Sequence, residues 1–388
     1  MAHSPRCTPI RAIAALVIVG TSAGVFHGQA AEAQENRAFL ETVRKHTTLT
    51  TTVPDNGDQN PYAIVVAPVS VGKVQKDDVL IDNFNDLSNL QGLGTTIVDY
   101  NPTTKKTTLF AQVPRHLPAC PGGVGLTTAM TMLKSGWVIV GSTPSNDGTT
   151  KTKGDGCLLV ISPTGELAAT WTGPDINSPW GNIATVDNGA TASLFISMAG
   201  FDVPGPEVHD PATGFSVTIS KATVLRLDLA IADGKPPAIV KRTVVADGFG
   251  QRADKDVFMI GPTGLAIGAN DTLYVSDALQ NRIVAIPDAT TRTTSAGTGK
   301  EITRDGLMAR PLAMVMAPNG HLLVCNSKNG KVVEIDPAAA KQIAAQWIDT
   351  DQAQSPPGSG DLFGIALTPD GKGFYYVEDD MNTVVEAR

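Results

Sequence analysis

The side chains best suited to acid–base or metal chemistry gather in one polar segment near the middle of the chain. His209 and Asp210 are neighbours there, and Glu207 and Asp202 lie shortly before them; a second histidine, His116, lies well upstream. Imidazole and carboxylate groups held close together can pass a proton to a substrate or bind a metal ion. The same residue types are also common on exposed loops, where they do neither. Both interpretations stay open, because the sequence does not fix the distances between these side chains.

Two other patterns do not predict a reactive group. Residues 20–24 read G-T-S-A-G, which fits the G-x-S-x-G motif of serine hydrolases, but they lie in an apolar N-terminal leader. Three of the four cysteines follow this leader, namely Cys120, Cys157 and Cys325, and none forms a C-x-x-C pair or a Cys/His spacing typical of zinc or covalent haem sites. We therefore expect neither structural zinc nor covalent haem.

The N-terminal leader has the features of an export signal. Arg6 and Arg11 precede or open a mostly apolar run over residues 12–26, and small residues after it offer an A-x-A cleavage site. The run is shorter than the roughly twenty residues that span a bilayer, which favours a cleaved signal over a membrane anchor. We predict that residues 1–33 are removed and that residues 34–388 form a periplasmic or extracellular protein without a membrane span.

The charge balance argues against a nucleic-acid partner. The chain has 30 Lys and Arg against 38 Asp and Glu, a net charge of −8, and its basic residues are not clustered. Binding to phosphates depends on the local density of Lys and Arg. The expected partners are therefore a small molecule, a glycan or a protein, and neither nucleic acid nor an anionic membrane.

A repeated unit of short strands runs through the chain. Each unit has an apolar strand, a Gly/Asn/Asp turn, a second apolar strand, another turn and a third strand; the clearest copies lie at 261–288, 310–337 and 360–386. Such turns favour tight hairpins because Gly and Asn adopt positive φ at low cost. A period of roughly forty to fifty residues with several strands per unit is typical of propeller blades.

The N-terminal half repeats this unit with longer connections. We predict blades near residues 60–113, 121–172, 179–248, 261–300, 310–350 and 360–388. The last unit stops after its third strand, so a strand near residues 47–53 is expected to supply the missing outer strand and close the ring. The sequence thus predicts an all-β, six-bladed β-propeller with about four antiparallel strands per blade. A pair of β-sandwiches is the alternative architecture.

The units at 261–288, 311–337 and 361–386 resemble NHL repeats. The chain as a whole is similar to the superfamily of propellers that includes gluconolactonase-like hydrolases, strictosidine-synthase-like proteins and virginiamycin lyase. The resemblance implies the propeller fold and a ligand site at the mouth of the central channel.

The same resemblance allows a test for a metal site. In gluconolactonase-like relatives a Glu, an Asn and an Asp at the openings of inner strands hold a divalent cation. Here Asn182 is the only residue of a ligand type, while the other openings read Asn60-Pro-Tyr62 and Pro262-Thr-Gly264. A hard cation such as Ca²⁺ prefers several oxygen ligands that include carboxylates. The resemblance therefore predicts no confident metal site, and no histidine matches that of virginiamycin lyase.

Loop lengths indicate which blades could bind a ligand. The connections between second and third strands are long in the first three units, over residues 83–95, 142–156 and 198–220, and short in the other three. Long loops need a functional reason more often than short ones, although drift on a tolerant surface also produces them. At the channel opening and on this rim we place the candidate ligand-binding residues Tyr62, Asn182, Thr263, Phe363, His116, His209 and Asp210.

Cys120 and Cys157 flank the second unit at the same face, so they are candidates for a disulfide that pins its long loop, but the sequence leaves open whether they are bridged. Cys325 lies in an apolar strand and is interpreted as a buried thiol. The neutral, partly aromatic residues at the channel opening suit binding better than hydrolysis. We therefore predict a ligand- or protein-binding module that uses the channel-mouth face of blades 1–3. The alternative is a hydrolase or lyase of the gluconolactonase or virginiamycin-lyase kind, with a divalent cation, Ca²⁺, in the channel mouth.

Overall fold

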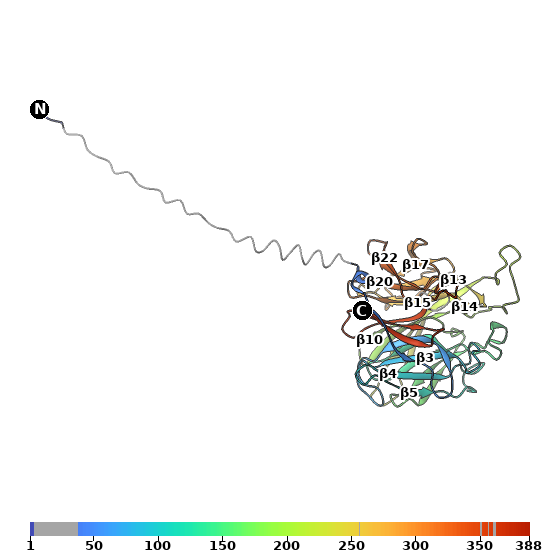
Figure 1. Cartoon of the computed structure of the whole chain (residues 1–388). Coiled ribbons are helices and arrows are strands. Elements are labelled where there is room, and N and C mark those ends of the chain that lie inside the picture. The colour runs from blue at the N-terminus through green and yellow to red at the C-terminus, as the bar shows by residue number, and fades with distance from the viewer. Residues whose placement is uncertain (4–37, 256, 350, 356, 360–361) are drawn as a thin grey trace. The chain divides into compact units, whose positions relative to one another are not determined.

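The apolar strands of the sequence form six antiparallel sheets that follow one another around a central channel (Figure 1). The computed structural model describes residues 1–3 and 38–388 except 256, 350, 356, 360 and 361. Nearly all of the predicted signal, residues 1–33, and its cleavage site lie outside the described residues. Among the helices described, none has the length and apolar character of a membrane span.

Each sheet is one blade, and in blades 1–5 its strands follow one another in the chain. Blade 1 contains β2 (Gln59–Val66), β3 (Val79–Asn85), β4 (Thr96–Asn101) and β5 (Lys106–Gln112), and blade 2 contains β6 (Leu126–Met132), β7 (Val138–Ser142), β8 (Cys157–Ile161) and β9 (Leu167–Trp171). Blade 3 contains β10 (Ala184–Asp187), β11 (Thr191–Met198), β12 (Ile219–Ala230), β13 (Ala238–Asp254) and β14 (Phe258–Ile260).

Blade 4 contains β15 (Pro262–Ile267), β16 (Leu273–Asp277), β17 (Arg282–Ile286) and β18 (Lys300–Arg304). Blade 5 contains β19 (Pro311–Met316), β20 (Leu322–Asn326), β21 (Lys331–Asp336) and β22 (Lys341–Trp347). Blade 6 contains β23 (Leu362–Leu367), β24 (Phe374–Glu378), β25 (Thr383–Ala387) and, as its outer strand, β1 (His46–Thr51). Two short 3₁₀ helices, η1 (Phe39–Thr42) and η2 (Thr150–Thr152), complete the described elements.

The N-terminal strand closes the ring. β1 pairs antiparallel with β25, from His46 opposite Ala387 to Thr51 opposite Thr383, and Figure 1 shows this blue strand beside the red C-terminal strands. The predicted six-bladed propeller and its closure by an N-terminal strand are confirmed, and the pair of β-sandwiches is excluded. One feature of blade 3 differs from the expectation: its fourth strand continues to Asp254, and the short β14 pairs with its end.

The blades hold together through apolar layers on both of their faces. β8 is buried along its whole length. Its alternate side chains point to opposite faces of the sheet, so Leu159 and Ile161 pack toward blade 1 while Leu158 and Val160 pack toward blade 3. This arrangement explains why the middle strands read as continuous apolar runs without the polar alternation of a half-exposed sheet.

A buried carboxylate fixes the chain just before β1. Glu334, on β21, accepts hydrogen bonds from the backbone N–H groups of Phe39 (2.8 Å) and Leu40 (2.9 Å) in η1. The Asn319 amide (2.9 Å) and the His321 ring nitrogen Nδ1 (2.7 Å) contact the same carboxylate. The segment that leads into the closing strand is therefore anchored to blade 5.

A side chain of the second strand supports the start of the inner strand in several blades. In blade 4 the Ser276 hydroxyl accepts the N–H of Gly264 (2.6 Å) and donates to the carbonyl of Leu312 in blade 5 (2.8 Å). Ser197 accepts the corresponding inner-strand N–H in blade 3, and Asp82 does so in blade 1. These hydrogen bonds hold the backbone at the start of the inner strands, where the sequence predicts the candidate site.

Candidate functional site

Antiparallel strands that run alternately up and down a blade bring two kinds of connection to the same face of the ring. These are the connections between second and third strands and those between consecutive blades; we name this side the loop face and the opposite side the hairpin face. The connections between second and third strands are long in blades 1–3, at residues 86–95, 143–156 and 199–218. In blades 4–6 they shrink to 278–281, 327–330 and 379–382.

Five aromatic rings close the channel at the loop face. Tyr62 lies between Phe84 and Phe363, with ring centroids 4.5 and 3.9 Å away and nearly parallel planes. Trp180 meets the edge of Phe84 and stacks on Phe258 at 6.0 Å. All five side chains are at most 2% exposed. We name Tyr62, Phe84, Trp180, Phe258 and Phe363 the aromatic plug.

The β13–β14 hairpin supplies the Phe258 ring of the plug. Phe258 has a φ of +64°, a backbone conformation that a bulky side chain rarely adopts. The base of the hairpin is held by a largely buried ion pair between Arg310 Nη2 and Asp254 Oδ2, 2.7 Å apart. A distorted backbone conformation is therefore kept in place by packing and by this ion pair.

The plug changes the expectation for three predicted ligand-binding residues. Tyr62 and Phe363 belong to the plug, and Thr263 is fully buried with its hydroxyl bonded to the carbonyl of Gly261 (3.1 Å). Burial raises the pKa of the Tyr62 hydroxyl well above its ordinary value, and the nearby Asp379 and Asp254 raise it further. The sequence expectation of an open mouth lined by these side chains differs from the structure, in which none of the three reaches solvent.

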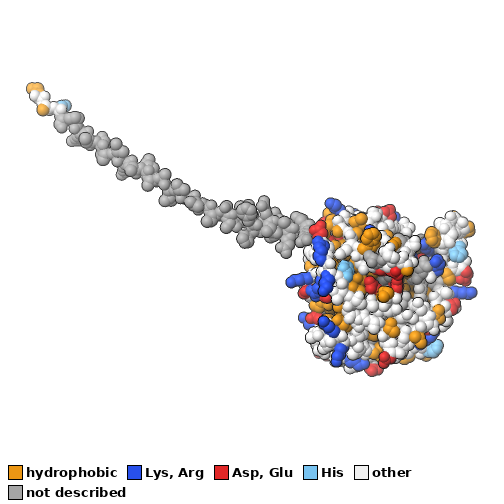
Figure 2. All heavy atoms as spheres, in the orientation of Figure 1, with side chains coloured by type: hydrophobic (Ala, Val, Ile, Leu, Met, Phe, Trp, Pro, Cys, Tyr) orange, Lys and Arg blue, Asp and Glu red, His pale blue; other side chains and the backbone are white. Residues whose placement is uncertain are grey.

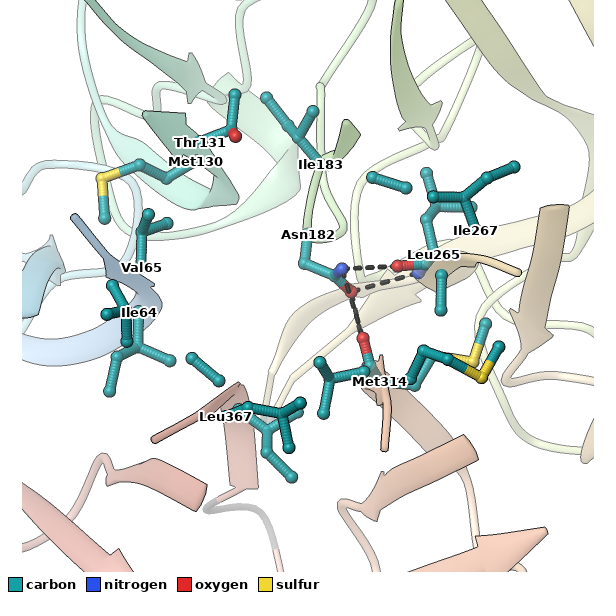
Figure 3. A pocket seen from close by; sticks show the side chains of 17 residues that line it. Ile64, Val65, Met130, Thr131, Asn182, Ile183, Leu265, Ile267, Met314 and Leu367 are labelled. Carbon is teal, nitrogen blue, oxygen red and sulfur yellow. Dashed lines mark hydrogen bonds between the residues drawn. The ribbon is translucent and has the colours of Figure 1, made fainter. Parts of the chain in front are cut away.

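Asn182 connects two other blades. Its amide Nδ2 donates to the carbonyls of Leu265 (2.7 Å) and Met314 (3.4 Å), and its Oδ1 accepts the N–H groups of the same two residues (3.1 and 3.4 Å), as Figure 3 shows in part. The side chain thus provides hydrogen-bond partners for backbone N–H and C=O groups at the free inner edges of β15 and β19. With its oxygen occupied and no carboxylate among the described residues that line the channel beside it, Asn182 does not fit the divalent cation that the resemblance implies.

The rest of the channel is a cavity of about 310 Å³ lined by the inner strands of all six blades (Figure 3). Its side chains are aliphatic or methionine apart from Asn182 and Thr131, and the Thr131 hydroxyl lies 2.9 Å from that of Thr185. None of the described residues that line the channel has a charged side chain.

Two larger cavities lie on the loop face of blades 1–3. The blade-1 cavity, about 470 Å³, is lined by Asn56, Asp58, Asp86, Leu93, Thr95, Gln112, Val113, Pro114 and Arg115. The blade-3 cavity, about 640 Å³, is lined by Pro174, Asp175, Phe201, Asp202, Ser220, Lys221, Thr223, Val244, Asp247 and Gly248. Both volumes fall in the range of ligand sites, which is roughly 300–1,000 Å³.

The two candidate histidines lie at the surface. His116 and His209 are exposed, and in the described part of the chain neither takes part in an ion pair or a side-chain hydrogen bond. Asp210 instead supports its own turn by accepting the N–H of Ala212 (2.8 Å). No group of three or more His, Cys, Asp or Glu side chains arranged to hold a metal ion occurs among the residues described.

The structure joins Cys120 and Cys157 by a disulfide that ties the long blade-2 loop to the connection before blade 2. Cys325 is a buried free thiol, and burial raises its pKa to about 12. Burial also shifts two groups that sequence reasoning missed: it raises the pKa of the Asp82 carboxyl to about 8 and lowers that of the Lys153 amine to about 8. Only the placement of Asp82 within an apolar second strand hinted at its burial.

No protein-family model matches the chain, and no curated protein sequence matches it significantly. Solved structures do resemble it. A gluconolactonase from Xanthomonas campestris superposes with a TM-score of 0.53 at 11% identity over 89% of each chain. A putative oxidoreductase (glucose dehydrogenase) from Thermus thermophilus gives 0.53 at 12% identity, over 89% of this chain and all of the other.

The aldose sugar dehydrogenase of Streptomyces coelicolor, solved with PQQ bound, gives a TM-score of 0.52 at 16% identity, over 89% of this chain and 98% of the other. Identities this low establish the fold alone. The chain has a six-bladed propeller fold, and a gluconolactonase is among the solved structures that resemble it. Its assignment to the NHL repeats stays a prediction.

Proposed function

We propose that this protein is a non-catalytic, NHL-type propeller that binds its ligand or partner through the loop face of blades 1–3. The observation that carries the proposal is the asymmetry of this face. The channel mouth is closed by the aromatic plug, whereas two solvent-reaching cavities and all three long loops lie over blades 1–3. Concave loop surfaces held on a rigid scaffold are common binding sites.

Exposed apolar side chains on the same loops support recognition. Leu87, in the long blade-1 loop, is 71% exposed, and Phe215, in the long blade-3 loop, is 56% exposed. The guanidinium of Arg252 lies 4.6 Å from the Phe215 ring centroid, which leaves an aromatic and a cationic group together at the surface. Aromatic and Arg side chains are enriched among the residues that contribute most to binding.

Two further features fit a module that acts outside the cytoplasm. Disulfides persist in oxidising compartments, and the Cys120–Cys157 bridge stiffens one of the three long loops. Lys and Arg side chains are interspersed with Asp and Glu over the face seen in Figure 2, an arrangement that suits neutral ligands better than polyanions.

The test is a thermal-shift screen of the purified protein against saccharides, polyols and short peptides, followed by hydrogen–deuterium exchange with any compound that raises the melting temperature. We expect protection in the loops at 86–95, 143–156 and 199–218. Protection confined to the hairpin face would contradict the proposal. A parallel assay for lactone hydrolysis is expected to show no turnover, and turnover abolished by a chelator would favour the hydrolase alternative.

A further inference from the structure

A carboxylate with one unused oxygen lies in the wall of the blade-1 cavity. Asp58 directly precedes β2, in the connection from blade 6 to blade 1, and is only 4% exposed. Its Oδ2 accepts hydrogen bonds from the Thr95 N–H (2.7 Å) and from the Thr95 and Thr96 hydroxyls (both 3.0 Å). Its Oδ1 accepts no hydrogen bond from the described residues, yet it is not sealed from solvent. Oδ1 is therefore the oxygen that a ligand in this cavity can reach.

The charged groups of the cavity leave one negative charge unbalanced. Arg115 Nη1 lies 3.7 Å from Asp86 Oδ2 and so compensates the charge of Asp86. Asp58 has no such partner among the described residues, and none of the others that line the cavity is Lys, Arg or His. Two carboxylates and one guanidinium give the lining a formal charge of −1. An ammonium group can balance this charge through a charge-assisted hydrogen bond, whereas an anion adds to it.

The rest of the lining suits an uncharged chain behind such an ammonium group. Leu93 and Val113 supply apolar surface, and the amides of Asn56 and Gln112 can both donate and accept hydrogen bonds. Asn56 and Gln112 also line a neighbouring cavity of about 670 Å³. A chain longer than the blade-1 cavity therefore has room to continue past these two amides.

We infer that the blade-1 cavity binds the protonated primary amine of its ligand through Asp58. The ammonium group donates to Asp58 Oδ1, and the uncharged chain that follows lies along Leu93 and Val113. The amino terminus of a peptide and a small aliphatic amine share this chemistry. The inference rests on the proposed binding function and names the chemical group that one part of the loop face recognises.

Calorimetric titration of the purified full chain separates the amine from the rest of the ligand. Trialanine amide, its N-acetyl derivative and n-propylamine are compared near pH 6.5, where α-amino groups are protonated. Trialanine amide should bind at least about tenfold more tightly than the acetylated peptide, because acetylation removes the charge that Asp58 recognises. Tighter binding of this peptide than of n-propylamine identifies a peptide amino terminus, and equal or weaker binding identifies a small amine. Binding of neither amine at millimolar concentrations, or binding of the acetylated peptide with the affinity of the free one, would overturn the inference.

Asp58→Asn separates recognition from structural support. The asparagine oxygen can still accept the hydrogen bonds of Thr95 and Thr96, while its NH₂ group takes the place of Oδ1. The variant should melt near the wild type and bind amines at least about tenfold more weakly. Asp233→Asn is the matched control, because it removes the same charge from an exposed side chain between β12 and β13, on the hairpin face. Its amine affinity should equal that of the wild type, and an unchanged affinity in Asp58→Asn would overturn the inference.

Arg115→Gln tests the charge balance without altering the buried carboxylate. The Arg115 side chain is 45% exposed, so its replacement should leave the fold intact. Without the guanidinium, Asp86 adds a second unbalanced negative charge, and amine binding at low ionic strength should strengthen about threefold or more. Unchanged or weaker amine binding in this variant would contradict the inference.

Hydrogen exchange with the bound amine separates this inference from the proposed function. Protection of residues 86–95 and 112–115 supports both. Protection confined to the loops at 143–156 or 199–218 leaves the loop-face function standing while the inference fails. Protection limited to the hairpin face defeats both.

Discussion

Phe258 stacks on Trp180, with ring centroids 6.0 Å apart and planes inclined by 26°. Phe258 comes from the added β13–β14 hairpin of blade 3, and Trp180 comes from the connection that enters the same blade. Their contact completes the aromatic plug and separates the channel from the loop face. These buried rings lie between the channel and the loop face, and under the proposed function the ligand binds on the rim instead.

Replacing Phe258 by alanine should open this seal. The variant leaves a cavity among four remaining rings, and a large-to-small change of this kind costs about 3 kcal/mol of unfolding free energy. Urea unfolding measures the loss, and acrylamide quenching should reach Trp180, which is 1% exposed in the native protein. Phe215→Ala is the control, since this exposed ring should change stability by less than about 0.5 kcal/mol. Equal effects of the two substitutions would show that the plug does not stabilise the fold.

Asp82→Asn should change how stability depends on pH. Burial raises the pKa of the Asp82 carboxyl to about 8, whereas in the unfolded chain it titrates near the ordinary value of about 4. Between these values the folded protein binds the extra proton, so the free energy of unfolding falls as the pH rises through this window. The asparagine variant resembles the protonated acid and lacks this loss.

Urea unfolding at pH 5 and pH 9 measures the difference between the two proteins. They should have similar stability at pH 5, and Asp82→Asn should be the more stable at pH 9 by on the order of 2 kcal/mol. Asp99, whose pKa burial and the neighbouring Asp78 raise to about 7, contributes with the same sign over a narrower range. Parallel pH profiles for wild type and Asp82→Asn would contradict the assignment of a protonated Asp82.

Removing the disulfide should destabilise the protein strongly. The bridge between Cys120 and Cys157 spans 37 residues, for which loop-closure entropy predicts a contribution of about 3–4 kcal/mol. The double variant Cys120→Ala/Cys157→Ala should show this loss in urea unfolding, and dithiothreitol should lower the wild type to the same level. If reductant changes the double variant as well, the effect does not come from this bridge.

Chelation should leave the melting temperature unchanged. The amide oxygen of Asn182 accepts hydrogen bonds from the backbone N–H groups of Leu265 and Met314, and the described residues that line the channel include no carboxylate. Differential scanning fluorimetry with and without EDTA, together with metal analysis of the purified protein, checks this expectation. A melting temperature lowered by several degrees, with stoichiometric Ca²⁺ in the untreated protein, would return the metal-dependent hydrolase to consideration.

The blades were predictable because their strands are local. Each hairpin joins neighbouring apolar runs through Gly, Asn or Asp turns, as at Gly320 and Gly371, whose positive φ suits a tight turn. The short last unit pointed to ring closure by the N-terminal strand, and β1 over His46–Thr51 confirms it. The long loops of blades 1–3 were also visible as polar insertions between such runs. For these features the pattern of adjacent residues is sufficient.

The candidate site depended on contacts between distant parts of the chain. The aromatic plug brings together Tyr62, Trp180, Phe258 and Phe363, which lie far apart in the sequence. No local sequence pattern predicts that these rings meet and exclude water. The sequence likewise made Asn182 a candidate ligand-binding residue. In the structure its amide instead donates hydrogen bonds to the inner strands of blades 4 and 5.

The sequence by itself determined the six-bladed architecture and the blades with long loops, because strand periodicity and turn chemistry act over a few residues. Only the tertiary structure decided that the channel is closed at the loop face and that cavities lie on the rim. Those features depend on which side chains from different blades come within contact distance, and that distance is set by the ring as a whole.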